Sequence, residues 1–239
     1  MAAIQPSQRL FVALDTPDEA RALALCGQLA GVVGGVKVGN ELFTAAGPAG
    51  VARLGATGLP VFLDLKFHDI PNTVGRAVRA ALALKPFMLT VHAAGGVAMM
   101  RAAAEAAAEA GAERPLLIGI TVLTSMNDEA LAATGVAGPV LGHAERLARL
   151  SRDNGLDGIT CSAHEAPLLR AACGPDFVLV TPGIRPAAVG GDDQKRTVTP
   201  AEAVRLGADC LVVGRPITGA DDPAAAARAV AAEIAEAGP

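Results

Sequence analysis

The sequence predicts an α/β protein of the TIM (β/α)8 barrel class, with one domain over residues 1–239. Eight short apolar runs alternate with segments of helical spacing, which favours a parallel sheet covered by helices. The composition, 51% hydrophobic and 18% charged residues, can fill a large core. A doubly wound open sheet is the alternative, but Asp15-Thr16-Pro17 stands where its Gly-rich first turn would be.

Four strand-helix units are expected in the first half of the chain. Their predicted strands are Leu10–Leu14, Gly35–Val38, Val61–Leu65 and Phe87–Val91. Their predicted helices are Pro17–Leu29, one from Glu41 or Pro48 to Gly55, Val74–Leu84 and Val97–Ala110. Asp18 and Glu19 favour the first helix, because acidic side chains stabilise a helix amino terminus.

The second half repeats the pattern with longer connections. Its predicted strands are Leu116–Val122, Gly158–Cys161, Phe177–Val180 and Cys210–Val213. Its predicted helices are Val140–Asn154, Glu165–Cys173, Pro200–Leu206 with Thr199 as N-cap, and Pro223–Ala235. Two connections, Ser125–Pro139 and Thr181–Pro200, are rich in Gly or Pro, and connections of this length are often functional.

Charge and cysteine usage restrict the possible partners. A net charge of −4 and a pI near 5.6 weigh against nucleic acid, although a small cationic pocket is still allowed. The four cysteines show no CxxC spacing and are expected to be reduced core thiols. Met1–Arg9 lacks a signal-peptide core and the apolar run Pro115–Met126 is too short to span a bilayer. We therefore expect a cytoplasmic protein without membrane contact.

Three charged side chains gather in the stretch Phe62–Thr73 at the end of the third strand. Asp64 and Lys66 are two residues apart, so an extended strand presents both on one face. Opposite charges in the mouth of a barrel are costly to desolvate unless they are paired and used. Asp69 follows, before Pro71 at the expected helix start. A lysine held between two carboxylates stays protonated, which suits a proton donor better than a nucleophile.

Further strand ends supply Asp15, Lys37, His92 and Thr124. Three of them have a structural alternative: Asp15 could cap a helix, Lys37 could be solvated, and His92 could be a packed histidine. The loops after strands seven and eight carry a second group of candidates, Arg185, Gln194, Gly214 and Arg215. In TIM barrels these loops commonly bind phosphate, whereas Gly214-Arg215-Pro216 taken alone could be a simple turn.

With these residues assembled, the chain resembles the orotidine 5′-phosphate decarboxylase family of the bacterial type, from about Leu10 to Ala235. The matching segments, in chain order, are LDT (14–16), KVGNELF (37–43), FLDLKFHDIPNTV (62–74), VHAAGG (91–96), TVLTS (121–125), DGITCSAHEA (157–166), TPGIRP (181–186), DQKR (193–196) and VVGRPIT (212–218). Their common order and spacing make the resemblance specific.

The resemblance implies decarboxylation of orotidine 5′-monophosphate to uridine 5′-monophosphate, the last step of de novo pyrimidine synthesis, without metal or organic cofactor. It also implies a homodimer with shared active sites. Lys66 would protonate C6, flanked by Asp64 of its own subunit and Asp69 of the partner subunit. The implied substrate-binding residues are Asp15, Lys37 and Thr73 for the ribose, Thr124 for the pyrimidine, Arg185, Gln194, Gly214 and Arg215 for the phosphate, together with Asp64 and Ile70.

Two other functions stay open at this point. One is a related, magnesium-dependent barrel that acts on sugar phosphates and similarly places DxK at its third strand. The other is a nucleotide-binding barrel without turnover, although no catalytic charge is missing here. The Thr181–Pro200 loop is expected to close over the phosphate and exclude water. With 3% aromatic residues, pyrimidine recognition should depend on hydrogen bonds and small apolar contacts.

Overall fold

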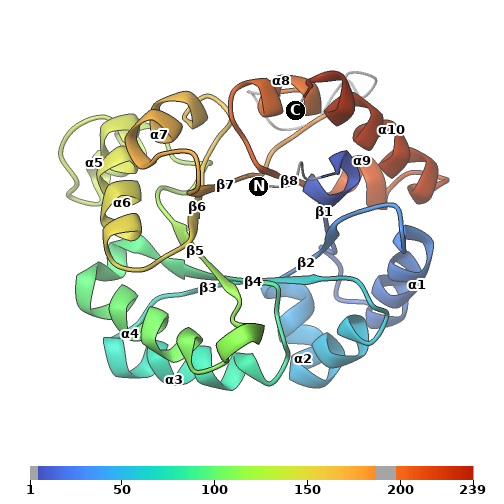
Figure 1. The fold of residues 1–239 in the computed structure, drawn as a ribbon, viewed down its shortest axis with the longest axis horizontal. Helices are drawn as coiled ribbons and strands as arrows, with labels where there is room; N and C mark the ends of the chain where they lie inside the picture. Colours follow the sequence, from blue (N-terminus) through green and yellow to red (C-terminus); the bar gives the residue numbers. More distant parts are fainter. Residues whose placement is uncertain (1–4, 187–197, 239) are drawn as a thin grey trace.

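The computed structural model describes residues 5–186 and 198–238, and these form the predicted TIM barrel (Figure 1). Eight parallel strands close in sequence order, because β8 also pairs with β1. The helices form a ring outside the strands (Figure 1). The strands are β1 (Leu10–Ala13), β2 (Gly35–Gly39), β3 (Val61–Phe67), β4 (Met88–His92), β5 (Leu116–Ile120), β6 (Gly158–Thr160), β7 (Val178–Thr181) and β8 (Cys210–Val213).

The helices confirm the predicted alternation. They are α1 (Glu19–Leu29), α2 (Asn40–Gly55), α3 (Pro71–Leu82), α4 (Gly96–Ala108), α5 (Asp128–Ala133), α6 (Val140–Asp153), α7 (Ala166–Cys173), α8 (Pro200–Arg205), α9 (Arg215–Thr218) and α10 (Pro223–Glu236). Short 3-10 turns are η1 (Pro6–Arg9), η2 (Ala93–Gly95) and η3 (Gly111–Glu113). Across the described ranges, no helix combines the length and hydrophobicity that crossing a membrane requires.

Short helices account for the main differences from the sequence prediction. The connection Ser125–Pro139 contains α5, which begins after Asn127, whose side chain accepts a hydrogen bond from the Ala130 amide. Six residues give less than two turns, too few for a clear apolar period. The helix after β3 begins at Pro71, as the proline indicated, three residues before the start at Val74 that the helical spacing gave.

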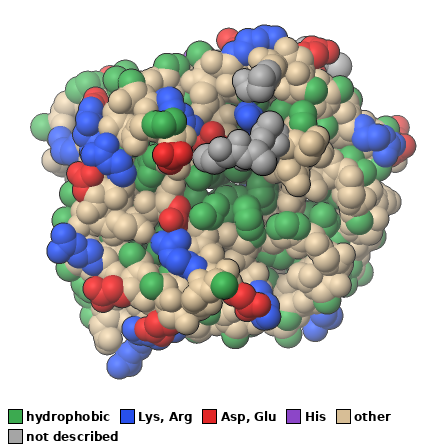
Figure 2. All heavy atoms as spheres, in the orientation of Figure 1, with side chains coloured by type: hydrophobic (Ala, Val, Ile, Leu, Met, Phe, Trp, Pro, Cys, Tyr) green, Lys and Arg blue, Asp and Glu red, His purple; other side chains and the backbone are tan. Residues whose placement is uncertain are grey.

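Apolar side chains fill two layers, one inside the barrel and one between strands and helices. Alternate strand residues point to opposite faces, so Phe11 packs inside while its neighbours Leu10 and Val12 pack outside. The inner cluster consists of Phe11, Ala13, Phe62, Met88, Ile118, Val180 and Val212. In the space-filling view, hydrophobic side chains gather at the centre over the barrel and most charged ones lie toward the rim (Figure 2). The inner layer forms the floor beneath the strand ends that carry the charges.

Candidate active site

A cavity of about 240 Å³ opens among the carboxyl ends of the strands. Lys37 of β2 and Asp64 and Lys66 of β3 line one part of it. Its remaining lining is mostly apolar and consists of Phe62, Ile120, Val122, Leu123, Thr124, Thr160, Val180, Pro182 and Val212. The cavity therefore places two ammonium groups and one carboxylate against a hydrophobic wall.

Four of the predicted charged residues form one array of alternating sign. The Lys66 ammonium lies 2.8 Å from Asp64 Oδ2, and the Lys37 ammonium lies 3.6 Å from the same oxygen. Lys37 also lies 3.3 Å from Asp15 Oδ1. The side chains of Lys37 and Asp64 are only 12% and 11% exposed, so their attraction is weakly screened by water. The prediction that β1, β2 and β3 bring their charges together is confirmed.

Lys37, rather than Lys66, lies between two carboxylates of this chain. Within the described residues, Lys66 forms an ion pair with Asp64 alone. Asp15 binds Lys37, while Asp18 caps α1 through the Arg21 amide, so the capping alternative for Asp15 is wrong. The second carboxylate expected at Lys66 is Asp69 of the partner subunit, and this stays a prediction.

The strand that carries Asp64 and Lys66 is not regular. Leu63 pairs with Leu89 and Phe67 with Val91, so residues 64–66 lie opposite a single residue of β4, Thr90. Lys66 has a left-handed φ of 52°, which is uncommon for a residue with a side chain. The simple prediction of an extended strand is therefore wrong here, although the two side chains do meet in the cavity.

Asp69, Ile70 and Thr73 lie outside the cavity, on the exposed segment where α3 begins. Asp69 Oδ1 accepts a hydrogen bond of 2.6 Å from the Ile70 amide. Ile70 is 66% exposed, more than any other large hydrophobic residue among those described. These three residues are therefore not brought to the Lys66 cavity of their own subunit.

The predicted phosphate-binding residues come from the segments after β7 and β8. Arg185 is 8% exposed and its backbone amide donates to the Val198 carbonyl at 3.1 Å. Gly214 precedes α9, and a side-chain carbon added there would lie 3.8 Å from Asp15 Oδ2. Arg215 is exposed at the start of α9. Gln194, and most of the loop expected to close over the phosphate, lie outside the described residues.

Several cavity residues were missed by sequence reasoning. Ile120, Thr160 and Val180 pair in register on β5, β6 and β7, and all three line the cavity. Thr160 Oγ1 is buried with no hydrogen-bond partner in the described part of the chain. Gly39 leaves room for the charged array, since a side-chain carbon there would lie 3.0 Å from Lys37 Nζ. The alternation of inward-facing and outward-facing residues along each strand could have indicated the apolar cavity-lining residues. Nothing in the sequence pattern marks Gly39 as part of the site.

Two histidines, the exposed His68 and the half-buried His92, stack on one another beside the charged array. The rings of His68 and His92 have centroids 5.0 Å apart and an interplanar angle of 24°. Burial lowers the pKa of His92, and the nearby His68 and Lys66 lower it further. Over the described ranges, no group of three or more His, Cys, Asp or Glu side chains is arranged to hold a metal ion.

The arrangement can stabilise a negative charge that develops near Lys66 and then deliver a proton to it. A cation held by fixed neighbours needs little reorganisation during the reaction. The mostly apolar lining lowers the local dielectric constant and so strengthens the interaction of the lysine with such a charge. The geometry suits proton donation to a negatively charged group that lies against this wall.

Known proteins share this fold and most of this sequence. An "Orotidine 5'-phosphate decarboxylase" from Rhodospirillum rubrum is 57% identical over 230 residues, which cover 94% of this chain and 93% of the relative. One from Nitrosococcus oceani is 54% identical, covering 95% and 97%. The crystal structure of orotidine 5′-phosphate decarboxylase from Lactobacillus acidophilus has a TM-score of 0.85 and 38% identity, covering 94% of this chain and 98% of that one.

The family match extends over nearly all of the barrel. The sequence model of the "Orotidine 5'-phosphate decarboxylase / HUMPS family" matches residues 8–230, from the turn before β1 into α10. The matched range includes every strand and all of the cavity-lining residues. This chain therefore belongs to the orotidine 5′-phosphate decarboxylase / HUMPS family.

Proposed function

We propose that this protein decarboxylates orotidine 5′-monophosphate to uridine 5′-monophosphate and carbon dioxide, in pyrimidine biosynthesis. The observation that carries the proposal is the Lys66 ammonium, held 2.8 Å from Asp64 in a cavity with a largely apolar wall. Relatives at 57% and 54% identity bear the name of this activity and support it.

The chemistry explains why such a lysine is needed. Loss of carbon dioxide from C6 leaves an electron pair in the plane of the pyrimidine ring, where the π system cannot delocalise it. A fixed cation must then stabilise the developing charge, and Lys66 can also supply the proton that completes the C6–H bond. Asp64 accepts a hydrogen bond from this ammonium, and in this proposal its negative charge repels the departing carboxylate.

The rest of the substrate would extend from the cavity toward the ends of β7 and β8. In this proposal Asp15 and Lys37 bind the ribose hydroxyls, and Thr124 contacts the pyrimidine. Arg185, Gly214 and Arg215, with Gln194, bind the phosphate. The buried position of Arg185 supports the phosphate assignment, and a side-chain carbon placed on Gly214 would lie 3.8 Å from Asp15 Oδ2, which puts the two proposed subsites next to each other.

We also propose that the active enzyme is a homodimer in which Asp69, Ile70 and Thr73 reach the partner's site. The exposed Ile70 side chain supports this proposal, because a large apolar group on the surface favours burial at an interface. The proposed place of action is the cytoplasm, consistent with the four unpaired cysteines.

The direct test follows the absorbance change of orotidine 5′-monophosphate with purified protein in EDTA. We expect turnover by the wild type and loss of turnover in Lys66→Ala, with binding of uridine 5′-monophosphate retained. If the wild type binds uridine 5′-monophosphate but leaves the substrate unchanged, it is a nucleotide-binding barrel and the proposal fails.

The same assay separates the other activity class of the family. A magnesium-dependent enzyme that acts on sugar phosphates would lose activity in EDTA and regain it with Mg²⁺. Lys37 and Lys66 already place two cations in the cavity and favour the metal-independent reaction. Turnover of a sugar phosphate, but not of the nucleotide, would establish the alternative.

Subunit mixing tests the shared site. Lys66→Ala and Asp69→Ala proteins should each be inactive, whereas mixed dimers contain one site with both residues intact. We expect up to about a quarter of wild-type activity to return after subunit exchange, on the statistics of random pairing. Exchange confirmed by mass spectrometry without any recovery would refute the shared site.

A further inference from the structure

Thr90 of β4 contacts both charged residues of the β3 end through a single hydroxyl group. Its side chain is fully buried. Its Oγ1 accepts a hydrogen bond from the Lys66 amide at 2.8 Å and lies 3.1 Å from Asp64 Oδ1. Thr90 does not line the cavity, so these contacts are made from behind the reacting groups.

The direction of the two hydrogen bonds follows from hydroxyl chemistry. A threonine hydroxyl has one proton to donate and two lone pairs that accept. The Lys66 amide can only donate, so it uses a lone pair of Thr90. The single proton is then directed to Asp64, whose carboxylate can only accept. Neither bond can reverse while Asp64 is ionised.

The contact lies where the β3–β4 ladder is interrupted. Residues 64–66 lie opposite Thr90 alone, and Lys66 adopts a left-handed backbone conformation. Such a conformation persists only where the surrounding structure holds it. The Thr90 hydroxyl anchors the amide of this residue, and the same group orients the carboxylate that binds its ammonium.

We propose that Thr90 is a positioning residue of this active site, which aims the Lys66 ammonium by holding the Lys66 backbone and the Asp64 carboxylate together. The proposal depends on the proposed decarboxylase function for its kinetic test. Because Thr90 acts through Lys66 and Asp64 and does not line the cavity, its loss should impair the chemical step without weakening substrate binding.

Two variants and a matched control test the proposal. Thr90→Val keeps the shape and removes the hydroxyl, whereas Thr90→Ser keeps the hydroxyl. Ser151→Ala is the control, since Ser151 on α6 is equally buried and its Oγ donates to the Leu147 carbonyl at 2.8 Å, away from the cavity lining. Unfolding temperature, kcat and KM for orotidine 5′-monophosphate, and Kd for uridine 5′-monophosphate are measured for each.

We expect kcat to fall about 10- to 100-fold in Thr90→Val, the range set by leaving one buried donor unsatisfied. KM and Kd should stay within about three-fold, as binding groups are unchanged. Thr90→Ser should recover most of the lost kcat, and Ser151→Ala should keep wild-type kinetics. A folded Thr90→Val protein with wild-type kcat, or one in which Thr90→Ser fails to recover activity, would overturn the proposal.

A crystal structure of Thr90→Val gives a result that does not depend on turnover. We expect Lys66 Nζ to move out of hydrogen-bond range of Asp64 Oδ2, from the 2.8 Å of the wild type. An unmoved Lys66 overturns the positioning role even if the protein has another activity. A wild-type protein that leaves the nucleotide unchanged contradicts the proposed function instead.

Discussion

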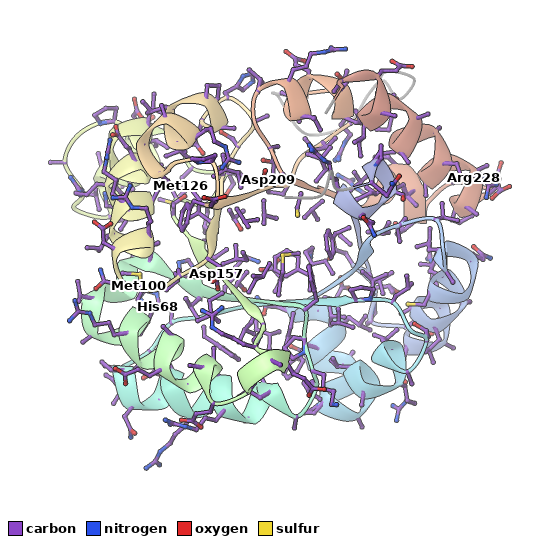
Figure 3. The ribbon with its side chains drawn as sticks, viewed as in Figure 1. His68, Met100, Met126, Asp157, Asp209 and Arg228 are labelled. Atoms are coloured by element: carbon purple, nitrogen blue, oxygen red, sulfur yellow. The ribbon has the colours of Figure 1, made fainter. Side chains whose placement is uncertain are left out.

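Arg170 of α7 contacts the segments that precede β7 and β8, at the end of the barrel opposite the cavity. Its guanidinium forms an ion pair with Asp209, which also accepts a hydrogen bond of 2.7 Å from the Leu179 amide. It donates to four carbonyl oxygens, those of Gly174 (2.9 Å), Pro175 (3.1 Å), Phe177 (2.7 Å) and Gly207 (3.0 Å). Asp209 is labelled in Figure 3 together with Asp157, which pairs with Arg114 before β6.

Replacing Arg170 by Met keeps most of the apolar stem and removes every one of these donors. Breaking a buried pair costs about 3–5 kcal/mol. The side chains of Arg170 and Asp209 are 23% and 32% exposed, so water replaces part of the loss. We therefore expect the free energy of unfolding to fall by about 2–3 kcal/mol. At about 2–4 °C per kcal/mol for a chain of this size, the unfolding temperature should fall by about 4–12 °C.

Urea denaturation measures the loss of unfolding free energy and thermal unfolding measures the fall in unfolding temperature. The value of kcat at 25 °C shows whether the active site is intact. Arg53→Met is the matched control, because Arg53 pairs with Glu19 but is 54% exposed, and such surface pairs contribute little to stability. Arg170→Met should keep wild-type kcat while folded. The reasoning is refuted if the two variants lose equal stability, or if Arg170→Met loses activity without losing stability.

Three further predictions use single side chains. Thr160→Val should raise the unfolding temperature by about 2–4 °C, measured by calorimetry, because it removes a buried hydroxyl without a partner in the described chain; a decrease contradicts this. Burial raises the pKa of Cys161 and of Cys210 to about 12, so both should resist a thiol reagent at pH 8 until the protein is unfolded. Burial, then His68, lowers the pKa of His92, so NMR should show it titrating below 6.5. The neutral His92 side chain contributes fully to the free energy of unfolding above pH 6.5, and this contribution is lost as the pH falls through the lowered pKa. His92→Gln cannot titrate, so its free energy of unfolding should fall less over the same pH range.

Local patterns explain why the barrel could be predicted. Each strand is a short apolar run, and in each major helix the apolar residues recur at helical spacing. Both patterns are local, so they can be recognised without knowledge of the tertiary contacts. The strand Cys210–Val213 was predicted with its observed bounds, and Thr199 caps α8 as expected. The short helices α5 and α9 were missed, because four to six residues give no usable period.

The charged array was only partly predictable. That Asp15, Lys37, Asp64 and Lys66 lie near one another follows from parallel strands that end at the same edge. That Lys37 bridges two carboxylates, and that Lys66 has one within its own chain, depends on side-chain directions in the folded barrel. Spacing along the sequence does not contain this information.

By itself, the sequence determined the fold class, the edge of the barrel that carries the chemistry, and the residue types gathered there. Only the tertiary structure decided that β3 breaks register opposite Thr90, that Lys66 becomes left-handed, and that one hydroxyl joins its amide to Asp64. The physical reason is distance along the chain: Thr90 is 24 residues from Lys66 and 26 from Asp64. Periodicity reports local conformation, whereas the pairing of two strands is settled by packing across the whole barrel.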